Sequence, residues 1–222
     1  MTNEDPRPGA LRRGLQTGRL EAFSDGVFAI AITLLIFAIA LPASAGQHLL
    51  RSVADLWPSY LGYVVSVSTI GAIWLGHAAV TEYLERTDVG FVRLNLLLLL
   101  VIAFLPFPTR LFASYIGKDS PERVAVTIYG LTFLLASALL LVLWRYALRY
   151  RLVRPDADDE EIQLLTKRLT PGLAGYMILI PAGLFIPIIA VIGYLAVAIY
   201  FIIPFRRGSI PLRRQRRQMP QP

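Results

Sequence analysis

The sequence predicts an all-α, polytopic membrane protein with six transmembrane helices per chain. Of its 222 residues, 55% are hydrophobic, and the mean hydropathy of +0.57 is far above that of soluble globular proteins. Long apolar runs alternate with short charged segments, and a helix that spans a bilayer needs about 20 mostly apolar residues. This composition excludes disorder for most of the chain. Because the chain has no cysteine and only two histidines, we expect no bound metal and no cofactor.

The first three helices are expected at about residues 20–42, 57–80 and 91–113. The first begins in a polar segment and continues as an apolar run, whereas the other two are apolar almost throughout. The third contains the sequence Leu105-Pro106-Phe107-Pro108-Thr109 near its end. Proline lacks a backbone N–H and clashes with the preceding helical turn, so this sequence predicts a kink or a stop.

The last three helices are expected at about residues 122–147, 170–186 and 187–206. The fifth and sixth together form one apolar stretch, which is too long for a single span, and we place the break between them near Pro187. The charged segment before this stretch, residues 154–167, predicts a short cytoplasmic helix. Aspartate is a favoured N-cap residue, so the candidate caps of that helix are Asp156 and Asp158.

Both ends of the chain are basic. Residues 1–18 predict a disordered cytoplasmic N-terminus and residues 207–222 a cytoplasmic tail, which leaves residues 19–206 as the transmembrane domain. The arginines before the first apolar run and the sequence Ala43-Ser44-Ala45 after it also resemble a cleaved secretory signal. That run starts only after about 20 polar residues and includes Asp25, unlike a signal peptide, so we predict that it is retained.

The basic residues also predict the orientation. With six spans, both termini lie on one side, and all but four of the 22 lysines and arginines fall on that side; the exceptions are Arg51, Arg110, Lys118 and Arg123. Lysine and arginine are enriched on the cytoplasmic side of membrane proteins. We therefore expect both termini in the cytoplasm and a location in the bacterial cytoplasmic (inner) membrane. The net charge of +7 then needs no nucleic acid, because the lipid bilayer offers anionic headgroups to the basic tail.

Polar side chains within the spans are concentrated in the first three helices, whereas the last three are nearly aliphatic and are expected to be scaffold. Because polar groups are costly in a bilayer, they indicate where function lies. They are Ser24, Asp25 and Thr33 in the first helix, Ser66, Ser68, Thr69, Trp74 and His77 in the second, and Asn95 in the third.

Helical phase separates the side chains of the first helix. At about 100° per residue, Ile30, Leu34 and Phe37 fall within roughly 40° of one another, Thr33 lies about 60° to one side, and Asp25 lies about 140° away. The apolar line could face lipid, other helices or a pore. Asp25 needs donors, for which Arg19, Trp74 and His77 are candidates, in either a structural cluster or a proton relay.

Three segments resemble a known family. Arg19-Leu20-Glu21-Ala22-Phe23-Ser24-Asp25-Gly26 is similar to the R-x-x-x-F-S-D-G signature of the transmembrane protein 175 family, in its prokaryotic branch with one six-helix unit per chain. Trp74-Leu75-Gly76-His77 resembles the W-x-x-H of the family's second helix. Asn95, followed by residues 105–109, is similar to its third-helix pattern. The resemblance covers roughly residues 19–206.

This resemblance implies a potassium-selective channel that assembles as a homotetramer around a pore lined by the first helix. The chain has no T-V-G-Y-G filter sequence, as in the family. By carry-over, Ile30 forms the constriction and hydrophobic gate, Leu34 and Phe37 follow it along the pore, and Thr33 supplies a polar ring. The resemblance also implies a structural hydrogen-bond cluster, whose members are Arg19, Ser24, Asp25, Trp74, His77 and Asn95.

A secondary transporter and an intramembrane enzyme are the alternatives to a channel. A secondary transporter, proton-coupled through Asp25 or His77, is the main alternative, because glycine- and proline-rich spans are compatible with the broken helices of transporters. An intramembrane enzyme would need a nucleophile and a base at bilayer depth. His77 is the only intramembrane imidazole and no serine is placed to pair with it, so we predict that the protein is not an enzyme.

Overall fold

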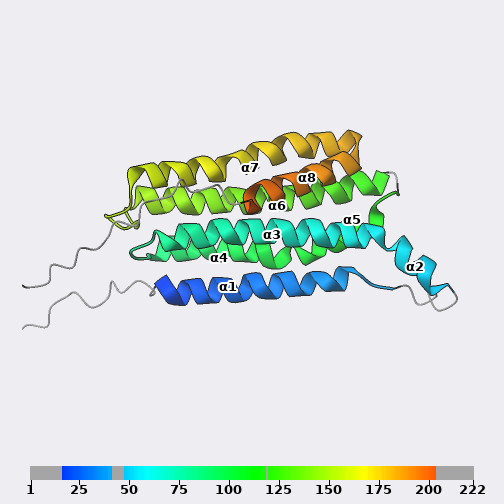
Figure 1. Ribbon diagram of the computed structural model, residues 1–222, viewed down its shortest axis with the longest axis horizontal. Coiled ribbons are helices and arrows are strands. Elements are labelled where there is room, and N and C mark those ends of the chain that lie inside the picture. The colour runs from blue at the N-terminus through cyan, green and yellow to red at the C-terminus, as the bar shows by residue number, and fades with distance from the viewer. Residues whose placement is uncertain (1–16, 42–47, 119, 204–222) are drawn as a thin grey trace, which may run out of the picture.

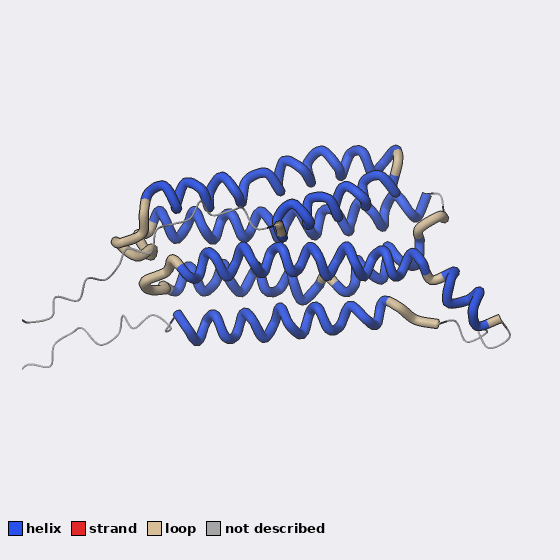
Figure 2. Tube along the Cα trace, viewed as in Figure 1, coloured by secondary structure: helices blue, strands red, loops and turns tan. Residues whose placement is uncertain are grey.

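The computed structural model describes residues 17–41, 48–118 and 120–203 as a bundle of roughly parallel and antiparallel helices (Figure 1). The signal-like sequence at 43–45, which we predict is not cleaved, lies outside these residues, as do the tail at 207–222 and nearly all of the N-terminal segment 1–18. The elements are α1 (Thr17–Leu34), the 3₁₀ turn η1 (Leu35–Ala38), α2 (Leu49–Asp55), α3 (Trp57–Glu82), α4 (Val89–Phe104), α5 (Pro106–Tyr115), α6 (Ser120–Arg149), α7 (Asp159–Phe185) and α8 (Pro187–Ile202). Helix dominates this part of the chain (Figure 2).

The protein is a multi-pass membrane protein. Five segments in the described part of the chain are long and apolar enough to cross a bilayer: α1 with η1, α3, α4 with α5, α6, and α7. The apolar helix α8 is shorter and has 16 residues. At 1.5 Å per residue it spans only about 24 Å, which is less than the hydrocarbon core of about 30 Å.

Proline decides where several helices begin and end. Pro106 starts α5 directly after Leu105, and Pro187 starts α8 after Ile186, as expected for a residue that fits the first helical turn. The first pass begins at Thr17, before the predicted start, and leaves helical geometry after Ala38, before the predicted end. The short helix α2 was not predicted.

The separate cytoplasmic helix predicted at residues 154–167 was wrong. Asp158 does cap a helix, with Oδ1 accepting from the backbone N–H of Glu160 at 3.1 Å, but this helix is α7 and it continues through Pro171. The junction is held by packing: Leu165 and Leu169 are buried, and Trp144 Nε1 donates to Thr166 Oγ1 at 2.8 Å. Tertiary contacts therefore outweigh the one backbone hydrogen bond that proline removes.

The core contains more polar chemistry than an aliphatic scaffold. Tyr129 of α6 is fully buried, and its Oη lies 2.6 Å from Ser66 Oγ of α3. Ser66 Oγ is also 2.7 Å from Thr109 Oγ1 of α5, while Tyr129 Oη donates to the Gly62 carbonyl at 3.1 Å. This hydroxyl cluster joins α3, α5 and α6 where the Pro106 break interrupts the third pass.

The first pass lies along one edge of the bundle. In Figure 1, α1 runs beside α3 and α4, and α7 and α8 lie at the opposite edge. One side of α1 therefore packs on the bundle, and the other has no neighbour within the described chain.

Candidate functional site

The buried face of α1 packs against α3 and α4. Its contact residues recur every three or four positions, as in any amphipathic helix that packs on one side; they are Leu20, Ser24, Phe28, Ala31 and, in η1, Leu35.

The opposite face of α1 carries an exposed apolar stripe. Ile30 is 60% exposed, Leu34 41% and Phe37 71% in the single chain. Thr33 is also exposed, and its hydroxyl donates to the Ile30 carbonyl at 2.8 Å. The structure thus brings together the four residues that helical phase placed on one side, and it presents them away from the protein's own core.

The 3₁₀ turn affects where Phe37 points. Residues three apart are 60° out of phase in an α-helix but eclipse one another in a 3₁₀ helix. Since Leu35 to Ala38 form such a turn, Phe37 continues the line of Leu34. Phe37 is 71% exposed, and it extends the stripe of Ile30 and Leu34 beyond the end of α1.

Beside the stripe of Ile30, Leu34 and Phe37, α1 carries a second exposed line, which is made of small residues. Ala22, Gly26 and Ala29 are all exposed and precede Thr33 at helical spacing. A Cβ atom added to Gly26 would meet nothing within 4 Å. The exposed half of α1 therefore carries two stripes: the bulky stripe of Ile30, Leu34 and Phe37, and the smooth stripe of Ala22, Gly26 and Ala29. Close helix–helix contacts in membranes use small residues of this kind.

A directional chain of hydrogen bonds ties α1 to α4 and α3. Asn95 Nδ2 donates to Ser24 Oγ at 2.9 Å, and the Ser24 hydroxyl donates to the Leu20 carbonyl at 2.9 Å. His77 Nε2 lies 2.8 Å from Asn95 Oδ1, which can only accept, so Nε2 carries the proton. Ser24, His77 and Asn95 are completely buried, and the rings of Phe28 and His77 pack with centroids 5.6 Å apart.

A second, separate contact lies at the edge of the same interface. Trp74 Nε1 donates to Asp25 Oδ1 at 2.8 Å. Both residues are exposed in the single chain, so Asp25 is a surface carboxylate of the single chain.

Five of the six residues predicted to form one cluster therefore form two separate groups: Ser24, Asn95 and His77 in one, and Asp25 and Trp74 in the other. Arg19 does not join them: it is exposed in the first turn of α1, and within the described ranges no hydrogen bond or ion pair connects it to Asp25. Arg19 is distant from the cluster because it lies more than one helical turn before Ser24. No group of three or more metal-ligating side chains occurs among the described residues.

The known proteins that resemble this chain are ion channels. The sequence model of a family described as "Endosomal/lysosomal potassium channel TMEM175" matches residues 19–106, from α1 to the start of α5. The chain is 42% identical over 168 residues to a potassium channel of Chamaesiphon minutus, covering 71% of this chain and 80% of that one. It is 35% identical over 200 residues to a potassium channel of Streptomyces collinus, covering 89% and 96%.

A solved structure shares the fold. The crystal structure of a lysosomal potassium-selective channel TMEM175 homolog from Chamaesiphon minutus matches with a TM-score of 0.76 and 36% identity, covering 83% of this chain and 95% of that one.

Proposed function

Because this chain belongs to the TMEM175 family, we propose that it is a potassium channel that conducts K⁺ passively through a pore lined by α1. In this proposal four copies assemble in the bacterial cytoplasmic membrane with both termini in the cytoplasm. The observation that carries it is the exposed stripe of Ile30, Thr33, Leu34 and Phe37, which has no partner in the described chain. The named relatives are channels, so a proton-coupled transporter is the less favoured reading, and an ion channel needs no enzymatic site.

The bulky stripe supplies the constriction. Four isoleucines at the level of Ile30 would form an apolar ring, and a narrow apolar neck excludes water and its ions by dewetting. Leu34 and Phe37 continue this lining in the same direction. Thr33 offers hydroxyl oxygens one position off the apolar line, where they can coordinate K⁺ that has lost part of its hydration shell.

The smooth stripe supplies the contact between neighbouring copies. Ala22, Gly26 and Ala29 let a second α1 approach closely, because their side chains add little bulk. The two stripes adjoin on one half of α1, so a copy seated on the smooth stripe leaves the bulky stripe facing the central axis. This arrangement supports a closed ring of four copies around a central pore that the α1 helices line.

The buried chain from His77 to Leu20 has a positioning role. It orients α1 on α3 and α4 through groups that have no water to replace them, and an unsatisfied polar group in a bilayer is costly. The constriction at Ile30 lies less than two turns beyond Ser24, so its position depends on this contact.

A flux assay tests the proposal. Purified protein is placed in liposomes loaded with K⁺ and diluted into Na⁺, and a proton ionophore with a pH dye reports the exit of K⁺. We expect a dye signal that is much weaker with internal Na⁺, and Ile30→Asn should raise the flux and weaken its selectivity because asparagine wets the neck.

The matched control for this substitution is Ile178→Asn on α7. Ile178 is 71% exposed and lies on a helix at the edge of the bundle opposite α1 (Figure 1), so it receives the same chemical change at a lipid-facing position. Flux through Ile178→Asn should equal that of the unmodified protein. Equal flux in both variants and the unmodified protein would remove Ile30 from the constriction.

A further inference from the structure

A cavity lies on the far side of the bundle from the exposed stripe, where the short helix α8 ends. It has a volume of about 210 Å³ and lies between α3, α7 and the end of α8. Its walls are formed by Leu75, Gly76 and Ala79 of α3, Arg168 and Leu169 of α7, and Phe201 of α8. Because α8 stops at Ile202, this cavity occupies the volume that a longer sixth helix would have filled.

Among the residues that the structure describes, Arg168 is the only charged one on the cavity wall. One guanidinium nitrogen, Nη2, donates to the carbonyls of Phe201 at 2.8 Å and Ile203 at 3.3 Å, at the C-terminal end of α8. A guanidinium has five N–H donors, and these two contacts engage one nitrogen. Among the described residues, no carboxylate forms an ion pair with Arg168. The half-buried guanidinium of Arg168 therefore lies in an apolar cavity and has N–H groups left that can bind another group.

The sequence places this charge at a membrane boundary. Arg168 is the last charged residue of α7, and residues 169–203 contain none. Residues before it include Lys167 and the acidic start of the helix. A cation at the end of an apolar span lies at the level of the lipid headgroups, so the cavity opens where phosphates are found.

We propose that this cavity binds one anionic phospholipid, with the headgroup phosphate on Arg168 and the first part of an acyl chain against Leu75, Ala79 and Leu169. Arginine binds phosphate oxygens through paired N–H donors, and basic pockets between transmembrane helices on the cytoplasmic side suit anionic headgroups. The volume is below the roughly 300–1,000 Å³ of a small-molecule site, which fits a segment of a chain.

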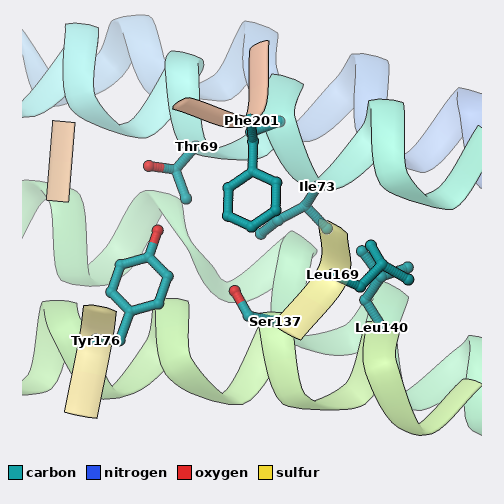
Figure 3. Close-up of a pocket in the computed structure, with 8 residues that line it drawn as sticks. Thr69, Ile73, Ser137, Leu140, Leu169, Tyr176 and Phe201 are labelled. Carbon is teal, nitrogen blue, oxygen red and sulfur yellow. The ribbon is translucent and has the colours of Figure 1, made fainter. Parts of the chain in front are cut away.

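The inner end of this cavity is closed by Phe201. Figure 3 shows its ring between Thr69 and Ile73, beside a second cavity of about 20 Å³ into which the hydroxyl of Tyr176 also points. That space is large enough for one water molecule and no more. The acyl chain therefore turns outward along α3 instead of entering the core.

Lipid binding is measured directly, without ion flux, so its result is independent of the channel proposal. Detergent-purified protein is titrated with phosphatidylglycerol or phosphatidylcholine and examined by native mass spectrometry. We expect phosphatidylglycerol to bind about tenfold more tightly, because the choline cation of phosphatidylcholine offsets the phosphate charge that both lipids present to Arg168. Arg168→Gln, which keeps N–H donors for the α8 carbonyls, should abolish this preference, whereas Lys167→Gln removes an equal charge from an exposed neighbour and should retain it.

A second variant keeps the guanidinium and fills the cavity. Ala79→Trp should weaken the binding of both lipids. If Arg168→Gln does not fold, this variant tests whether the lipid binds in the cavity. A phosphatidylglycerol preference that survives Arg168→Gln, or binding unchanged in Ala79→Trp, overturns the proposal. So does a change in oligomeric state in Ala79→Trp, which would assign the cavity to contact with a second copy of this chain.

Discussion

Trp74 Nε1 donates a hydrogen bond to Asp25 Oδ1 at 2.8 Å on the exposed side of the α1–α3 contact. One residue earlier on α1, Ser24 accepts from Asn95 at 2.9 Å on the buried side. The pore-helix candidate is thus held from two sides at one level, and the two contacts differ in their exposure to solvent or lipid. Removing the two contacts should therefore lower the free energy of unfolding by different amounts.

Asp25→Ala should have a small effect on stability. The variant loses one hydrogen bond, but the Trp74 indole is 39% exposed and finds other acceptors, so we expect a loss of about 1 kcal/mol in the free energy of unfolding. Denaturant titration in detergent, followed by tryptophan fluorescence, measures it. If the folded and assembled variant instead changes its ion preference, the structural role given to Asp25 is wrong.

Asn95→Leu should destabilise the protein more. The buried His77 N–H then loses its acceptor, and an unsatisfied buried group costs about 1–3 kcal/mol. The same titration provides the measurement, with Leu96→Ala at an exposed position of α4 as the control. A smaller loss for Asn95→Leu than for Asp25→Ala would contradict the ranking of the two contacts.

Tyr129→Phe should weaken the junction of α3, α5 and α6. It removes only the hydroxyl that contacts Ser66 and the Gly62 carbonyl, so we expect a loss of about 1–2 kcal/mol. Tyr200→Phe, at a tyrosine that is 58% exposed, makes the same chemical change and should leave the unfolding transition in place. Equal transitions for the two variants would show that the buried hydroxyl cluster adds nothing to stability.

Gly26→Leu should reduce assembly without unfolding the single chain. Its side chain has open space in one copy but would collide with a neighbouring α1 on the smooth stripe. Native mass spectrometry or light scattering in detergent should show a loss of tetramer, while circular dichroism stays unchanged. Gly71→Leu on α3 is the control, because Gly71 is equally free of close neighbours. A tetramer intact in Gly26→Leu moves the contact elsewhere.

Phe37→Ala should raise the single-channel conductance and leave the preference for K⁺ over Na⁺ unchanged. Phe37 follows Leu34 along the stripe, beyond the constriction assigned to Ile30, so it adds resistance without setting the narrowest point. Bilayer recordings measure both quantities. Ile36→Ala, at a position that is 50% exposed in the same 3₁₀ turn, should conduct like the unmodified protein, and an increase there instead would assign the lining to Ile36.

Helical periodicity was sufficient to predict that Ile30, Leu34 and Phe37 share one side of the first helix, because they are related by rotation about one axis. That this side is exposed in the single chain follows only from how the helix packs on the bundle. Asn95 was predictable as a bridge between helices, since a lone amide in a span must find a partner. Which partner it finds depends on helix packing, and so the chain through Ser24 and His77 could only be named as a set of candidates.

Other features depend on contacts that the sequence does not encode locally. The hydroxyl of Tyr129 was overlooked because an aromatic residue in an aliphatic span resembles ordinary core. The course of α7 through Pro171 follows from burial of Leu165 and Leu169, which proline rules do not include. Arg19 was grouped with Asp25 as a candidate donor and through the family resemblance, although helical phase separates the two side chains.

The direction of the hydrogen bonds from His77 through Asn95 to Ser24 restricts how α1 can move. Every donor in that chain has one acceptor, and sliding α1 by one turn, about 5.4 Å, would leave all of them unmatched inside the bilayer. The part of α1 around Ser24 is therefore fixed relative to α3 and α4. The 3₁₀ turn that follows Leu34 is joined to the bundle by apolar contacts alone within the described residues, and these tolerate small displacements. In the pore proposed above, dilation begins at this turn while the hydrogen-bonded part of α1 stays in place.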